Sequence, residues 1–129
     1  MEIIVRGAPT PKGRPRKAMD GHMYTPQETK DYEELVAILT RIATRSTLGG
    51  ALKVRIDFYM PTPKSIKKKM DKTGELCRPT TKPDIDNLSK SVLDGMNSIA
   101  YFDDKQIVDL HCRKFYSDNP RTEIQVEEI

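Results

Sequence analysis

The stretch that organises this chain runs from Lys82 to Ile99 and reads KPDIDNLSKSVLDGMNSI. It begins with a proline and with two carboxylates one residue apart, Asp84 and Asp86. Apolar side chains then recur every three or four residues, which is the spacing of one face of an amphipathic helix. These apolar residues are Ile85, Leu88, Val92, Met96 and Ile99. We therefore expect a helix over 86–99 with the acidic pair at its start.

The acidic pair has two interpretations. Side chains at i and i+2 of an extended segment share one face, so Asp84 and Asp86 are able to act on one ligand together. In the other interpretation Asp86 only caps the helix and Asp84 is only a turn residue. Lys90 lies one turn beyond Asp86 on the same polar stripe. From there it would stabilise charge on a phosphate or help to activate water.

A second acidic pair, Asp103-Asp104, follows the helix and precedes an apolar run. This pair is either an ordinary turn or a second group of ligands. Several carboxylates in one site are costly unless a cation neutralises them, and Mg²⁺ prefers oxygen ligands. We predict that Asp84, Asp86 and Asp104 converge on one divalent metal ion.

The remaining pattern predicts an α+β fold with a small mixed sheet and two main helices. An apolar β-branched run predicts a strand over 2–6, and apolar alternation predicts strands over 52–60, 107–116 and 122–127. We expect the last two strands to form a hairpin. The first main helix begins at Thr25-Pro26 as N-cap and first helical residue, with Glu28 completing a capping box, and stops at Gly49-Gly50. The order is β-α-β-α-β-β within one domain, 1–129.

Two basic segments flank these elements. The first contains three prolines and a glycine, and carries Lys12, Arg14, Arg16 and Lys17. The second, 64–82, holds seven Lys or Arg against two acids, so its net charge is 7 − 2 = +5, and it includes Lys67, Lys68 and Lys69. Each segment is either a solvated loop or a contact for phosphates, for which arginine is especially suited. Finding two such segments in one small chain favours phosphate contact.

Composition narrows the class of protein. The chain has 129 residues, a net charge of +3 and 36% hydrophobic residues, which is low enough that a second copy is expected to help complete its core. Its two cysteines, Cys77 and Cys112, have no metal-type spacing and predict free thiols in the cytoplasm. We find no apolar run of membrane-spanning length and no secretory signal.

Several runs resemble the RusA family of Holliday-junction resolvases, the crossover junction endodeoxyribonucleases. They are KPDIDNLSK at 82–90, LDGMN at 93–97, YFDDKQI at 101–107, GAP at 7–9, PKGRPR at 11–16 and MPTPKS at 60–65. The resemblance covers nearly the whole chain and has no departure at the acidic positions. Gly95 is a mild departure, because a bulkier residue would favour helix.

The resemblance implies a Mg²⁺-dependent endonuclease, with Mn²⁺ as an alternative ion, that acts as a homodimer on four-way DNA junctions in recombination and repair. By position, Asp84, Asp86 and Asp104 match the family's essential carboxylates, and Lys90 matches its essential lysine. Asp103 matches a frequent acidic neighbour and is a further candidate ligand. Family members often come from phages and prophages. Two alternatives remain open: a nuclease acting on other branched or flapped DNA, and a non-catalytic DNA-binding relative.

Overall fold

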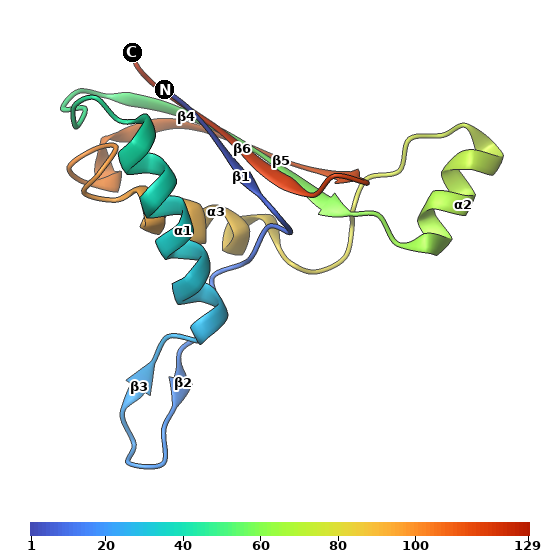
Figure 1. Ribbon diagram of the computed structural model, residues 1–129, viewed down its shortest axis with the longest axis horizontal. Helices are drawn as coiled ribbons and strands as arrows, with labels where there is room; N and C mark the ends of the chain where they lie inside the picture. Colours follow the sequence, from blue (N-terminus) through green and yellow to red (C-terminus); the bar gives the residue numbers. More distant parts are fainter.

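A four-stranded mixed sheet forms the centre of the computed structural model, which describes residues 1–129 (Figure 1). Its strands are β1 (Glu2–Arg6), β4 (Leu52–Pro61), β5 (Ile107–Ser117) and β6 (Arg121–Glu128). They lie in the order β1-β6-β4-β5. Only the β4–β5 pair is parallel; the other two pairs are antiparallel. The predicted α+β class with a small mixed sheet is confirmed.

Two helices, α1 (Gln27–Ala43) and α3 (Ile85–Met96), cover one face of this sheet (Figure 1). The core lies between the sheet and the helices. From α3 it takes Leu88, Val92 and Met96, each 0% exposed, which are three of the five apolar positions of the predicted helix. The central strand β4 contributes a buried residue at every second position. The periodicity therefore identified the buried faces of both elements.

The predicted hairpin between the last two strands is wrong. β6 pairs with β4 and β1, and β5 lies on the opposite side of β4. The physical reason lies in β4, whose inward residues Val54, Ile56 and Phe58 are fully buried. Such a strand is covered best between two neighbours. The short connection 118–120 therefore passes the end of β4 instead of folding β6 back onto β5.

The ends of α1 also differ from the prediction. Pro26 is the N-cap, and no side chain caps the helix. The helix ends at Ala43, well before Gly49-Gly50, and the Thr44 hydroxyl donates to the Thr40 carbonyl at 2.6 Å. Threonine hydroxyls that bond back in this way compete with helix continuation. Two large apolar side chains of this helix, Leu35 and Ile42, are exposed.

Three small elements accompany this frame. α2 (Lys64–Thr73) lies in the second basic segment, buries no residue and stands apart from the sheet (Figure 1). β2 (Arg16–Lys17) and β3 (Met23–Tyr24) form a separate hairpin that projects from the body. Only the turn of this hairpin, at Asp20–Gly21, is predicted by the sequence. A 3-10 turn, η1 (Asp104–Gln106), precedes β5.

Gly95 lies where α3 packs closely against α1. A Cβ atom at this position would lie 2.8 Å from Val36 Cβ and 3.0 Å from the carbonyl oxygen of Glu33. Real Cβ atoms essentially never come this close to a neighbour. The glycine that departs from helix propensity is therefore required by helix packing.

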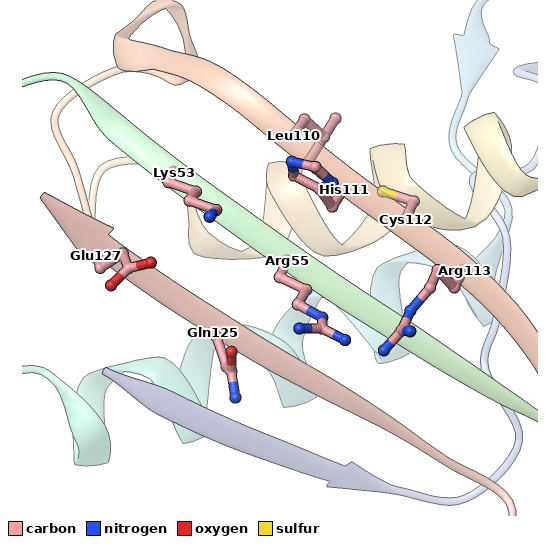
Figure 2. Close-up of a pocket in the computed structure, with 8 residues that line it drawn as sticks. All are labelled: Lys53, Arg55, Leu110, His111, Cys112, Arg113, Gln125 and Glu127. Atoms are coloured by element: carbon pink, nitrogen blue, oxygen red, sulfur yellow. The ribbon is translucent and has the colours of Figure 1, made fainter. Parts of the chain in front are cut away.

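The second face of the sheet is open and polar. A hollow of about 560 Å³ lies on this face. Figure 2 shows the side chains from β4, β5 and β6 that line it. The carboxylate of Asp57 accepts two hydrogen bonds from Arg113, each 2.8 Å long, so much of the positive charge here is paired internally. Cys77 and Cys112 are both free thiols. No helix is long and apolar enough to cross a bilayer.

Candidate active site

Asp84 and Asp86 lie at the amino end of α3. Asp84 is the N-cap and Asp86 belongs to the first turn, so the expectation that Asp86 caps the helix is wrong. The Asp84 side chain makes no capping hydrogen bond. Both residues are exposed, and neither carboxylate takes part in a salt bridge. The helix dipole stabilises negative charge at this end. Two free carboxylates therefore face the same solvent region.

The loop before α3 is held in place by β5. The ammonium of Lys114 donates to the carbonyls of Thr81 and Pro83, both at 2.8 Å. The Ser89 hydroxyl on α3 donates to Cys112 Sγ at 3.0 Å, which ties the first turns of the helix to the same strand. The acidic pair is thus carried by a helix end that is fixed to the sheet.

The N-terminal basic loop is attached to the other side of α3. The backbone N–H of Lys12 donates to the carbonyl of Asn87 at 2.8 Å, and the Ser91 hydroxyl donates to the carbonyl of Thr10 at 2.6 Å. These bonds bring Arg14 into the surroundings of Asp84. Residues far apart in the sequence therefore meet at the start of α3.

Asp84 lies between two hollows with basic linings. One, of about 650 Å³, is lined by Asp84 together with Lys12, Arg14 and Lys82. The other, of about 510 Å³, is lined by Asp84 and Asp86 together with Arg78, Arg113 and Lys114. An extended polyanion laid across the two hollows would pass the carboxylates at its middle. This arrangement suits a nucleic-acid backbone, because basic side chains position phosphates.

Lys90 is exposed on α3, one turn beyond Asp86, and forms no salt bridge. Its ammonium therefore remains available to a ligand bound at the acidic pair. This agrees with the position expected for Lys90 from the sequence.

Asp103 and Asp104 lie at the opposite end of α3. The Tyr101 hydroxyl donates to the carbonyl of Leu93 at 2.8 Å and so fixes the connection to the last turn of the helix. A hydrogen bond with Asp103, burial, and the charges of Asp103 and Asp94 raise the pKa of Asp104. Asp104 therefore lies near Asp94. Asp94 is eight residues beyond Asp86 on α3, and eight helical residues span about 12 Å.

Asp103 has a structural role of its own. Its carboxylate accepts a hydrogen bond from the backbone N–H of Lys105 at 3.0 Å and so caps η1. Gln106 completes the capping box by accepting from the backbone N–H of Asp103 at 3.0 Å. The turn containing Asp104 is therefore a defined structure.

Within one chain these acids do not assemble into a metal site. No three His, Cys, Asp or Glu side chains are grouped so that they could hold a metal ion. Carboxylate oxygens are suitable ligands for Mg²⁺, but Asp84 and Asp86 lie at one end of α3 and Asp104 lies at the other. A single copy therefore does not fit the three-carboxylate site predicted from the sequence.

The predicted phosphate contacts have different surroundings. Lys12 forms salt bridges with Glu33 and Asp94, so its charge is used inside the protein. Burial lowers the pKa of Lys12, but the two carboxylates outweigh this effect and the pKa is raised overall. Arg16 approaches Glu28 at 3.9 Å, and Lys67 approaches Asp118 at 3.2 Å. Arg14, Lys17, Lys68 and Lys69 are exposed and form no salt bridge.

Sequence reasoning missed three basic residues beside the acidic pair: Arg78, Arg113 and Lys114. Arg78 lies in the predicted basic segment but was not singled out, and the other two belong to β5. The register of β5 along β4 decides which of its side chains reach α3, and that register is a long-range property. No local signal in the sequence would have found Arg113 and Lys114, whereas Arg78 belongs to the basic segment 64–82 that the sequence does predict.

Comparison with known proteins agrees with this geometry. A family model described as "Endodeoxyribonuclease RusA" matches residues 6–127. The chain belongs to the RusA family. It is therefore related to endodeoxyribonucleases, which explains free carboxylates set among basic side chains. Nucleases of the RusA family are generally dependent on divalent metals.

Two relatives of this RusA-family chain illustrate the range of similarity. The uncharacterized protein YqaN of Bacillus subtilis (strain 168) is 38% identical over 137 aligned positions, which cover 100% of this chain and 96% of YqaN. The crossover junction endodeoxyribonuclease rusA of Lactococcus phage r1t is 41% identical over 51 residues, which cover 39% of each protein. The full-length similarity is thus to a protein without a described activity.

Proposed function

We propose that this protein is a divalent-metal-dependent endodeoxyribonuclease that cuts four-way DNA junctions by hydrolysing phosphodiester bonds. The observation that carries the proposal is the unpaired Asp84–Asp86 pair between two basic hollows, in a chain that belongs to the RusA family. Mg²⁺, or Mn²⁺ in its place, would supply positive charge for the phosphate and a bound water of lowered pKa.

The chain's own residues would divide the work. Arg14 and Lys82 on one side of Asp84, and Arg78 on the other, would hold successive phosphates so that the scissile one lies over the acidic pair. Lys90 would stabilise the negative charge that develops on the phosphate. The lysines of α2 would extend the contact to a further part of the DNA, because this helix stands away from the sheet.

We further propose that the working form is a homodimer in which two copies complete each site. One chain keeps Asp84 and Asp86 apart from Asp104 along α3 and forms no three-ligand group. A two-fold axis that packs two α3 helices antiparallel would bring the amino end of one helix to the carboxyl end of the other. The pair from one copy would then meet Asp104 of its partner.

The segment that carries Asp104 also has a surface suited to a second copy. Phe102, Val108 and Leu110 are 67%, 65% and 44% exposed. Three large apolar side chains so close in sequence to a functional acid are more than the isolated exposed residues common on monomers. Covering them would bury apolar area at the same interface that completes the site.

The test is a cleavage assay with three labelled substrates in parallel: a four-way junction, a flap and a linear duplex. We expect Mg²⁺-dependent, paired cuts in the junction and little cutting of the duplex. Preference for the flap would assign the protein to other branched DNA. Binding without any cutting, in Mg²⁺ and in Mn²⁺, would make it a non-catalytic DNA-binding relative and overturn the proposal.

A further inference from the structure

The β2–β3 hairpin leaves the body of the molecule without covering any other element. Figure 1 shows it projecting away from the sheet and from α1. Its two strands pair only with each other. Every residue from Arg14 to Tyr24 is exposed except Ala18, which is half-buried. The hairpin therefore adds nothing to the hydrophobic core.

The hairpin nevertheless carries exposed apolar side chains around a hydrogen-bonded turn. Met19 is fully exposed at 108%, Met23 is 59% exposed and Tyr24 is 39% exposed. A tight turn places Met19 at the end: the N–H of Gly21 donates to the carbonyl of Ala18 at 2.9 Å, and Gly21 adopts φ +92°. The carboxylate of Asp20 bonds to the ring and to the backbone N–H of His22. The turn thus holds an apolar side chain out in water.

Each face of the hairpin combines a cation with an apolar or aromatic group. Arg16 is paired directly with Tyr24, and Lys17 with Met23. Directly opposed residues of an antiparallel pair share one face. The Tyr24 ring lies 6.1 Å from the His22 ring between centroids. A cation beside a flat or polarisable group matches a nucleotide, whose phosphate is charged and whose base presents a π-face.

The base of the hairpin is fixed to the start of α1 and adjoins the candidate active site. The N–H of Gly13 donates to Thr29 Oγ1 at 2.9 Å, and a Cβ atom on Gly13 would lie 2.9 Å from Pro26. Arg14, the next residue, lines the same hollow as Asp84. Five residues of extended chain separate Arg14 from Met19, a reach of at most about 17 Å. DNA held at Asp84 would therefore lie within reach of the tip.

We propose that this hairpin, with Met19 leading and Met23 and Tyr24 behind it, inserts between bases at the branch point of the DNA and selects branched over continuous duplex. The inference rests on the proposed function and deepens it. Apolar side chains, methionine among them, act as wedges that unstack base steps at a cost of a few kcal/mol per step. Bases at a branch point are already poorly stacked, so insertion there costs less than in duplex.

The test uses a four-way junction with 2-aminopurine at the branch point, because the fluorescence of this base rises when it unstacks. Binding is followed in EDTA, which prevents cleavage, with the wild-type chain and with Met19→Gln/Met23→Gln. We expect a fluorescence rise with the wild type, its loss with the double variant, and about tenfold less preference for junction over duplex. Met19→Phe should retain the fluorescence rise. Ile129 is an exposed apolar residue outside the hairpin, so Ile129→Gln should leave the fluorescence rise unchanged.

An equal fluorescence rise with the wild type and the double variant, or no rise with a wild type that binds and cuts junctions, would overturn the inference alone. A double variant that sediments at a different mass would assign the tip to contact with a second copy and would also overturn it. A wild type that neither binds nor cuts junctions would instead defeat the proposed function, and the inference with it.

Discussion

At the scale of single residues, the proposed site is built on carboxylates that the fold leaves unpaired. Replacing Asp86 with Asn removes one negative charge but keeps the shape of the side chain. We expect cleavage to fall at least about 100-fold, because even outer partners of metal ligands are typically worth roughly 10- to 100-fold. Junction binding should be unchanged or tighter, since a charge that repels phosphate is removed. Cleavage and gel-shift assays separate the two effects.

Asp31→Asn is the matched control for this variant. Asp31 is exposed on α1 and accepts a hydrogen bond only from Gln27. It should cut junctions at the wild-type rate. Cutting at the wild-type rate by Asp86→Asn as well would show that the acidic pair has no part in the reaction.

Gly95 supports a prediction about stability. Alanine is the better helix former by about 1 kcal/mol, so propensity alone predicts a gain from Gly95→Ala. The added methyl group would contact Val36 and the carbonyl of Glu33 at distances that real Cβ atoms avoid. Overpacking of this kind costs about 1–3 kcal/mol, so we expect a net decrease in the free energy of unfolding, measured with urea.

Gly49→Ala controls for the general effect of removing a glycine. Its Cβ would lie 3.7 Å from Phe102, an ordinary contact. It should leave the unfolding midpoint nearly unchanged. An unfolding midpoint for Gly95→Ala that matches or exceeds the wild-type value would mean that α1 and α3 are not in close contact at this point.

At the scale of elements, α2 is expected to act through charge rather than packing. It buries no residue, and its exposed lysines include Lys68 and Lys69. We expect Lys68→Ala/Lys69→Ala to weaken junction binding. The slope of log K against log salt should fall by roughly 2, because each lysine that no longer neutralises a phosphate lowers it by about one. Thermal stability should not change.

Arg41→Ala/Arg45→Ala removes the same number of charges from the end of α1 and its following loop. This control should alter the salt slope much less, because these arginines lie outside both basic segments and line neither hollow beside Asp84. Equal salt slopes for the α2 variant and the wild type would remove α2 from the DNA-contacting surface.

The sequence predicts features that depend on short-range interactions and misses features that depend on long-range ones. Local periodicity located β4 and α3 and their buried faces, because alternation and helical spacing are properties of short segments. It did not predict that β4 lies between β5 and β6, since pairing partners depend on contacts across the whole chain. The end of α1 was not predicted either, because it depends on the hydrogen bond from the Thr44 hydroxyl to the Thr40 carbonyl.

The candidate site was predictable to a similar extent. Asp84, Asp86 and Lys90 are close in sequence, and the structure places all three on the exposed start of α3. The position of Asp104 was not predictable, because it depends on where the connection after α3 packs. Lys12 was counted as a phosphate contact because its pairing with Glu33 and Asp94 spans two helices and cannot be seen in the sequence.

At the scale of the whole molecule, the separation of the acidic residues along α3 is the basis of the proposed homodimer. With Asp84 and Asp86 at one end and Asp104 at the other, each proposed site needs residues from two chains. A dimer of this kind also presents two sites related by two-fold symmetry, as the two cut strands of a four-way junction are. Paired cleavage would then follow from the symmetry of the assembly.

Mixing two inactive variants tests this arrangement most directly. We expect Asp86→Asn and Asp104→Asn each to be inactive alone. In a mixed dimer, one site contains both substituted residues, and the other site contains Asp86 and Asp104 unchanged. Random pairing makes about half of the dimers mixed, and each mixed dimer has one intact site out of two. About a quarter of all sites are then intact, so we expect junction nicking to return to about a quarter of the wild-type level. If verified mixed dimers bind the junction but remain inactive, the acids do not combine across two chains, and the proposed site is wrong.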